Sequence, residues 1–166
     1  MMNWIKAGEL YELRTENESL VSLKFDLLNS TTFKIRNQEY TIRKKGFWQP
    51  YYLVYKGELL IATLRHDFWG SKGRIELANH TTYNVEYTFK NTLTLKFLHK
   101  EQEILSYHVE TTGAVSKSVF KVGVVIVEEE LLLVLAALGM TIFLGIFNEF
   151  TTHDGDAAML MMISAI

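Results

Sequence analysis

The sequence predicts an all-β protein, a closed antiparallel barrel of about 11–12 strands that encloses a hydrophobic C-terminal helix. Two observations lead to this fold class. From about residue 8 to residue 127, apolar and polar residues alternate with a period of two, as in strands that are buried on one face. Leu131–Phe147 is a run of 17 residues without a charge, apolar on every side of a helix, and such a helix lies inside protein or lipid.

The expected strands are short and rich in β-branched and aromatic residues, a composition that favours a sheet. Turn signals such as Asn37-Gln38 and Lys56-Gly57 separate them. Short connections between so many strands indicate that neighbours pair antiparallel. In chain order, the apolar positions of the expected strands are Tyr11/Leu13, Val21/Leu23/Phe25/Leu27, Phe33/Ile35, Tyr40/Ile42, Tyr51/Leu53/Tyr55, Leu60/Ala62/Leu64, Ile75/Leu77, Tyr83/Val85/Tyr87/Phe89, Leu93/Leu95/Phe97, Leu105/Tyr107/Val109 and Phe120/Val122/Val124/Ile126.

The helix is expected at about residues 129–147, behind three acidic residues that suit the positive end of its dipole. Seventeen residues span about 25 Å, whereas the hydrocarbon of a bilayer is roughly 30 Å thick. No Lys or Arg follows the helix to anchor it at a membrane surface. A barrel of about eleven strands is wide enough for a helix about 10–12 Å across. We therefore expect the helix inside the barrel, with a C-terminal membrane anchor as the alternative.

Small residues recur at every fourth position of the expected helix, at Ala137, Thr141 and Gly145. In lipid such a stripe is a dimerisation face. Inside a barrel, we expect the stripe to let one wall approach the helix closely.

We expect one domain over residues 1–150 and a C-terminal tail over residues 151–166. The tail contains the apolar stretch Ala157–Ile166. Three roles remain open for it: covering a barrel end, meeting a second copy of the chain as a homo-oligomer, or touching a membrane. The N-terminal segment lacks the run of about 7–15 apolar residues of a secretory signal. This predicts a cytoplasmic protein, with membrane association left open.

Basic residues gather in one part of the chain. All 17 Lys and Arg lie at or before Lys121, and residues 34–74 hold nine of them against three acids, a local net charge of nine minus three, or +6. This charge favours an anionic partner. Because it is not the dense basic stripe of a nucleic-acid-binding protein, no nucleic-acid partner is expected.

The order of the elements, about a dozen antiparallel strands and then a wholly apolar helix, resembles the tubby C-terminal-like fold. Within it, the chain is similar to the LURP-one-related proteins and their bacterial relatives. Three segments carry the resemblance: FKIRNQEYTIRKKGFW at Phe33–Trp48, YYLVYKGELLIATL at Tyr51–Leu64 and EEELLLVLAALGMTIFLGIF at Glu128–Phe147. The resemblance covers about residues 20–150 and implies a helix-filled barrel.

The resemblance also implies a class of ligand. Tubby domains hold phosphoinositide head groups at membranes with Lys and Arg of neighbouring strands, whereas most LURP-one-like members have no assigned activity. Arg36, Arg43 and Lys45 are the residues that the resemblance would put at comparable outward positions. It therefore implies a partner with anionic head groups.

The residues themselves indicate a site at the outer ends of a hairpin around Gly57. If Pro50–Lys56 pairs with Glu58–Arg65, the flanking segments Lys44–Gln49 and His66–Lys72 meet at one end. They bring two Phe-Trp pairs beside cations, which suits a membrane interface or an anionic ligand; the alternative is that the aromatic rings plug the barrel mouth. With the outer basic strands included, the predicted ligand-binding residues are Arg36, Arg43, Lys44, Lys45, Trp48, His66, Trp69 and Lys72.

The sequence contains no pattern that indicates catalysis or metal binding. Cys is absent, the five His lack metal-ligand spacing, and His153–Asp156 has the character of a solvated acidic turn. We therefore expect no enzyme, no cofactor and no metal. The expected function is a non-enzymatic module that binds anionic phospholipid or a membrane surface. The alternatives are self-association or partner binding through Ala157–Ile166, and a tail-anchored membrane protein.

Overall fold

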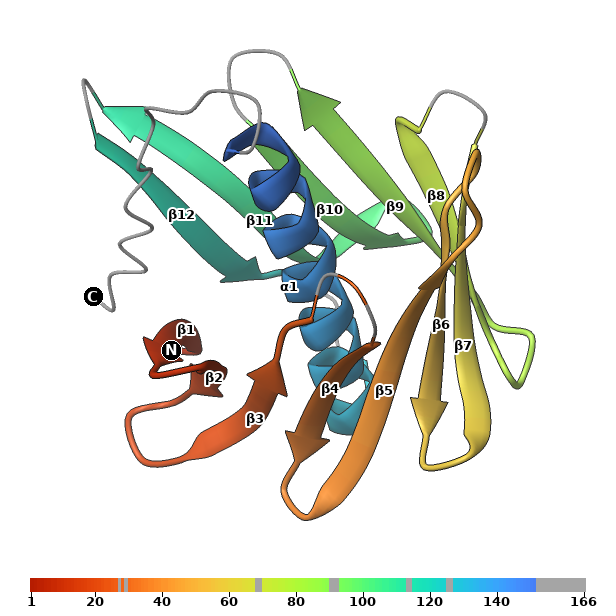
Figure 1. Cartoon of the computed structure of the whole chain (residues 1–166), viewed down its shortest axis with the longest axis horizontal. Helices are drawn as coiled ribbons and strands as arrows, with labels where there is room; N and C mark the ends of the chain where they lie inside the picture. The colour runs from red at the N-terminus through yellow and green to blue at the C-terminus, as the bar shows by residue number, and fades with distance from the viewer. Residues whose placement is uncertain are drawn as a thin grey trace.

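The computed structural model describes residues 1–26, 28, 30–67, 70–89, 93–112, 115–124 and 127–151. In these ranges, twelve antiparallel strands form one sheet in which each strand pairs with its neighbours in sequence (Figure 1). The all-β prediction is therefore confirmed. The strands are β1 (Asn3–Ala7), β2 (Leu10–Arg14), β3 (Ser19–Lys24), β4 (Ser30–Ile35), β5 (Gln38–Lys45), β6 (Tyr51–Lys56), β7 (Leu59–His66), β8 (Lys72–Leu77), β9 (Thr82–Phe89), β10 (Leu93–His99), β11 (Gln102–Thr112) and β12 (Val115–Val122), and the helix α1 (Glu129–Thr151) follows them.

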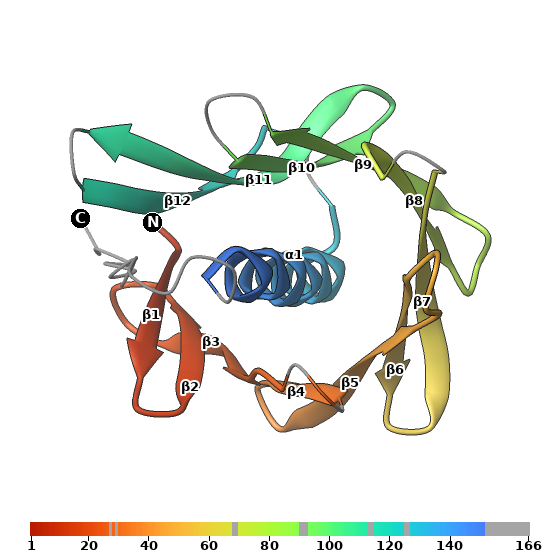
Figure 2. The ribbon, with the colours of Figure 1, turned by 45° about the horizontal axis from the view of Figure 1, so that its top comes forward.

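The sheet curls into a nearly closed barrel around α1, as Figure 2 shows, with β1 and β12 at the two ends of the strand order. On the inside, a side-chain hydrogen bond connects β1 to β11, the strand that pairs with β12. The indole N–H of Trp4 in β1 donates to the hydroxyl of Tyr107 in β11 at 2.9 Å. Tyr107 donates in turn to the backbone carbonyl of Ala136 in α1 at 2.6 Å. One buried phenol therefore links β1, β11 and the helix.

The helix fills the barrel, as predicted. Every residue from Leu133 to Leu144 is buried, and these residues form one core with the inward side chains of the strands. Glu129–Ile146 is long and apolar enough to cross a membrane, but 67% of this stretch is buried inside the barrel. The helix continues past Phe147 to Thr151. The tail from residue 152, with the roles considered for Ala157–Ile166, lies outside the described residues.

The helix and the wall approach each other closely at Gly139. A Cβ atom there would lie 2.5 Å from a ring carbon of Tyr107 and 3.0 Å from one of Phe97. Gly139 is not part of the predicted stripe. At Gly145, which is part of it, a Cβ would meet nothing within 4 Å. The hydroxyl of Thr141, which is buried in the core, donates a hydrogen bond to the Ala137 carbonyl at 2.8 Å. A wall therefore lies close to the helix at Gly139, whereas the stripe residue Gly145 makes no such close approach.

The connections between strands fall at two ends of the barrel. We call the upper end the one at which β5 leads to β6, β7 leads to β8, and α1 finishes (top of Figure 1). At the lower end β2 leads to β3, β4 leads to β5, β6 leads to β7, and α1 begins. Since the helix runs from the lower end to the upper end, its acidic first turn and its last turn mark opposite mouths of the barrel.

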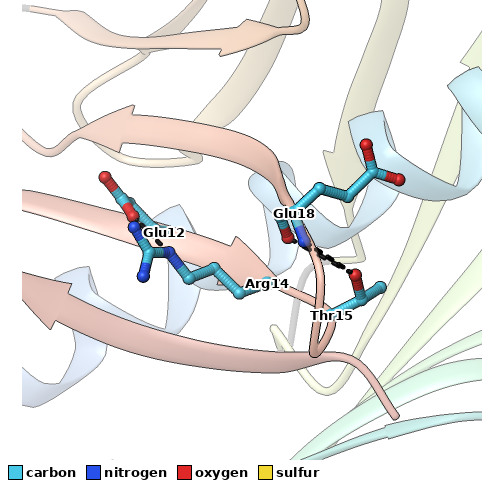
Figure 3. A network of polar contacts seen from close by, with 4 residues as sticks. All are labelled: Glu12, Arg14, Thr15 and Glu18. Atoms are coloured by element: carbon cyan, nitrogen blue, oxygen red, sulfur yellow. Dashed lines mark hydrogen bonds and ion pairs between the residues drawn. The ribbon is translucent and has the colours of Figure 1, made fainter.

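Polar side chains hold the β2–β3 turn at the lower end (Figure 3). The Thr15 hydroxyl accepts from the backbone N–H of Glu18 at 3.3 Å, and the backbone N–H of Thr15 donates to the Glu18 carbonyl at 3.0 Å. Beside the turn, Arg14 and Glu12 form an ion pair at 2.7 Å. These polar groups are hydrogen-bonded or ion-paired with one another, as expected of a turn with a structural role.

Candidate functional site

The predicted hairpin around Gly57 is present, and it sets up the upper end. β6 pairs with β7 through a turn in which Gly57 adopts φ +58°, a conformation that favours glycine. A β-bulge after Val54 shifts the register once. The hairpin therefore carries the connection before β6 and the connection after β7 to the same mouth of the barrel.

The loop between β5 and β6 presents two aromatic rings to solvent. Gly46 has φ +81°, and a Cβ there would lie 2.6 Å from the Gln49 carbonyl oxygen, so this tight loop requires glycine. Phe47 and Trp48 are 90% and 92% exposed and meet edge to face, with ring centroids 5.3 Å apart. We call Phe47 and Trp48 the aromatic loop tip. They do not plug the barrel mouth, so that alternative is wrong for this pair; Phe68 and Trp69 lie outside the described residues.

Below this loop, three cations line up across the outer wall of the barrel. Lys45 in β5 pairs with Tyr51 in β6, Tyr51 pairs with Arg65 in β7, and Arg65 pairs with Arg74 in β8. All three cationic side chains are exposed. The guanidinium of Arg65 lies over the Tyr51 ring at 4.9 Å. We call Lys45, Arg65 and Arg74 the cationic row.

The cationic row carries an unfavourable internal repulsion. Arg65 and Arg74 are direct cross-strand partners, whose Cβ atoms are separated by about 5 Å in such pairs. Like charges in that position destabilise a sheet. The wall next to the row adds a further cation, because Arg43 also points outward from β5 and lies over the Tyr55 ring at 4.8 Å. An anion bound here would offset this repulsion.

His66 lies on the inner side of the rim rather than in the cationic row. Its Nδ1 is 3.1 Å from the Pro50 carbonyl at the end of the aromatic loop, and its Nε2 contacts the Tyr87 hydroxyl of β9. Because a carbonyl can only accept, Nδ1 carries the proton, and Nε2 accepts from Tyr87. Burial lowers the pKa of His66 below its ordinary value of 6.5. His66 therefore connects β7 to the base of the loop as a neutral imidazole.

The remaining predicted residues divide between the two ends. Lys44 is exposed at the upper rim and lines a small cavity of about 30 Å³ with Asp26 and Thr141. Lys72 begins β8 and is the cross-strand partner of Glu86. Both therefore lie at the upper end with Lys45, Trp48 and His66.

Arg36 is at the lower end and does not join the others. It occupies the β4–β5 turn and forms an ion pair with Glu129 in the first turn of α1 at 3.1 Å. Beside it, Glu130 accepts hydrogen bonds from Lys56 at 2.6 Å and from the Tyr40 hydroxyl at 2.7 Å. The hydrogen bond from Lys56 and the one from Tyr40 lower the pKa of Glu130, while burial and the hydrogen bond to Glu130 raise the pKa of Tyr40 to about 12.

These five groups line a pocket of about 330 Å³ together with Leu133 and Ile35. The cations of the pocket are paired with carboxylates of the helix. The pocket therefore serves to fix the start of α1 in the barrel.

Sequence reasoning missed Arg65 and Arg74. Both alternate correctly with buried neighbours, so each was recognisable as an outward residue. What the sequence did not supply was the register that makes them partners. The alternation in one strand predicts on which side of the sheet a residue lies. The cationic row depends in addition on how four strands pair with one another.

Comparison with known proteins identifies no relative of this chain. The chain matches no family model, no curated protein and no solved structure. The resemblance to tubby-like and LURP-one-related proteins stays a prediction from the sequence.

Proposed function

We propose that the protein is a non-enzymatic module that binds the surface of anionic membranes with the upper end of its barrel. The observation that carries the proposal is the exposure of Phe47 and Trp48 at a loop tip, beside the cationic row of Lys45, Arg65 and Arg74. Aromatic side chains partition into the boundary between head groups and acyl chains. Lys and Arg near an anionic surface are attracted by about 1 kcal/mol each.

The spacing between the loop and the cations supports this proposal. Lys45 is the last residue of β5 and immediately precedes the loop. Arg65 immediately precedes His66, the last residue of β7. Measured along the strands, at about 3.3 Å per residue, the cationic row lies within roughly 10 Å of the tip of the loop. An apolar group at a membrane interface sits about 5–10 Å into the head-group and acyl boundary. With the aromatic tip at that depth, the row would lie among the phosphates.

The aromatic tip is tested with the double variant Phe47→Ala, Trp48→Ala. We expect its affinity for phosphatidylcholine vesicles that contain phosphatidylglycerol to fall by about tenfold or more, because two interfacial side chains are lost. The measurement is co-sedimentation with these vesicles and with pure phosphatidylcholine vesicles. The matched control is Leu59→Ala, Leu60→Ala, which removes two exposed apolar side chains at the lower end. Equal losses in the two double variants would contradict the proposal.

The cationic row is tested with Arg65→Gln, Arg74→Gln. We expect weaker binding to the anionic vesicles and a weaker dependence on salt, since two screened charge interactions are removed. The same variant should keep or raise the Tm, because it removes a like-charge pair from neighbouring strands. Lys34→Gln is the control, since Lys34 is exposed in β4 near the lower end. Wild-type binding that ignores lipid charge would reject the role of the row.

A further inference from the structure

We propose that His66 makes membrane binding sensitive to pH, so that binding to an anionic surface strengthens on acidification. The inference rests on the proposed function and concerns the regulation of the same upper end. The ring of His66 is bound to the base of the loop that carries Phe47 and Trp48, because its Nδ1 donates to the carbonyl of Pro50, the residue between that loop and β6.

The two ring nitrogens respond differently to a proton. Nδ1 already carries hydrogen and donates to the Pro50 carbonyl at 3.1 Å. A second proton goes to Nε2, which faces the Tyr87 hydroxyl. That hydroxyl can rotate and accept instead of donating. The contact between His66 and the loop is therefore kept in both states, and protonation adds one positive charge under the loop without releasing it.

The groups around His66 keep it neutral in the free protein. Burial is the largest influence, and the charge of Lys44 acts in the same direction, while the Pro50 carbonyl and Asp67 act against them. On β8 the cross-strand partner is Gly73, which brings no ionisable side chain. Among the described residues, the ionisable groups that face the ring are Lys44 from β5, Tyr52 from β6, Tyr87 from β9 and Asp67, which follows β7.

An anionic membrane changes this balance. Its negative surface potential favours the charged imidazolium over the neutral ring. By linkage, a surface that raises the proton affinity of His66 is itself bound more tightly when His66 is protonated. One added cation near such a surface corresponds to about a fivefold change in affinity. Because burial lowers the pKa of His66, the response lies toward the acidic side of the range in which imidazoles ordinarily titrate.

The experiment compares co-sedimentation with phosphatidylglycerol-containing vesicles at about pH 7.5 and about pH 5.5. We expect the affinity of the wild type to rise about fivefold at the lower pH, and that of His66→Gln to change by less than about twofold. Glutamine can donate to Pro50 and accept from Tyr87, so the loop contact is kept. The control His80→Asn removes an exposed histidine of the β8–β9 connection and should respond like the wild type. Asparagine tolerates the φ of +64° at that position.

A direct titration keeps the inference testable even if His66→Gln is unstable. The imidazole of His66 is titrated by NMR in the wild-type protein, free and on phosphatidylglycerol nanodiscs, and its midpoint should rise on the nanodiscs. An unmoved midpoint, or the same pH response in His66→Gln and wild type, would overturn the role of His66 alone. No binding to the anionic vesicles at either pH would overturn the proposed function, and the inference with it.

Discussion

A chain that ends before Glu128 is expected to lose cooperative folding altogether. The residues from Leu133 to Leu144 are all buried against the inner wall of the barrel. Without them, inward side chains such as Phe33, Phe97 and Leu64 would line a water-filled cylinder. Each large apolar side chain contributes about 1.5–3 kcal/mol on burial, which is large against a net stability of about 5–15 kcal/mol. The shortened chain should show no sigmoidal unfolding transition in urea, followed by circular dichroism.

The control for this truncation is a chain that ends after Thr151. It keeps the whole of α1 and every buried helix residue, so we expect it to unfold cooperatively with an unchanged dependence on urea. The comparison separates a helix that belongs to the core from one that only tethers a finished domain. A chain without the helix that still unfolds cooperatively, and is more soluble, would show that the barrel does not need α1.

The helix inside the barrel could be predicted because two independent quantities had to agree. An uncharged apolar helix needs apolar surroundings, and a barrel of about eleven strands has the right width to enclose one.

The first strand, β1, was harder to predict from the sequence. In β1 only Trp4 is buried, and its neighbours Ile5 and Lys6 do not alternate clearly, so no period of two marks Asn3–Ala7. This strand is defined by pairing with β2 and by the bond from Trp4 to Tyr107, which joins residues 103 positions apart.

The candidate site was predictable only in part, for a related reason. The hairpin at Gly57 follows from local sequence, and it brings Lys45, Trp48 and His66 to one end as expected. The positions of Arg65 and Arg74 opposite one another depend on the register of β7 and β8. The direction of the His66 ring depends on Tyr87 and Pro50, which come from two other elements. Alternation in one strand contains none of this information.

Replacing Gly139 with alanine is expected to destabilise the protein, against the intrinsic preference of a helix for alanine. Alanine at an ordinary helix position is worth up to about 1 kcal/mol over glycine. At Gly139 the new Cβ would lie 2.5 Å from Tyr107 and 3.0 Å from Phe97. Overpacking of this kind costs about 1–3 kcal/mol, and Gly139→Leu should cost more. The measurement is the free energy of unfolding in urea.

Gly145→Ala is the matched control for this prediction, because it makes the same chemical change in the same helix where a Cβ meets nothing within 4 Å. It should keep or raise stability, so the two variants should shift the urea midpoint in opposite directions. Tyr107 cannot easily yield to a methyl group at Gly139, since its hydroxyl is fixed between Trp4 and the Ala136 carbonyl. A stable Gly139→Ala protein would mean that the wall can move away from the helix. The phenol that joins β1, β11 and α1 would then not fix their spacing.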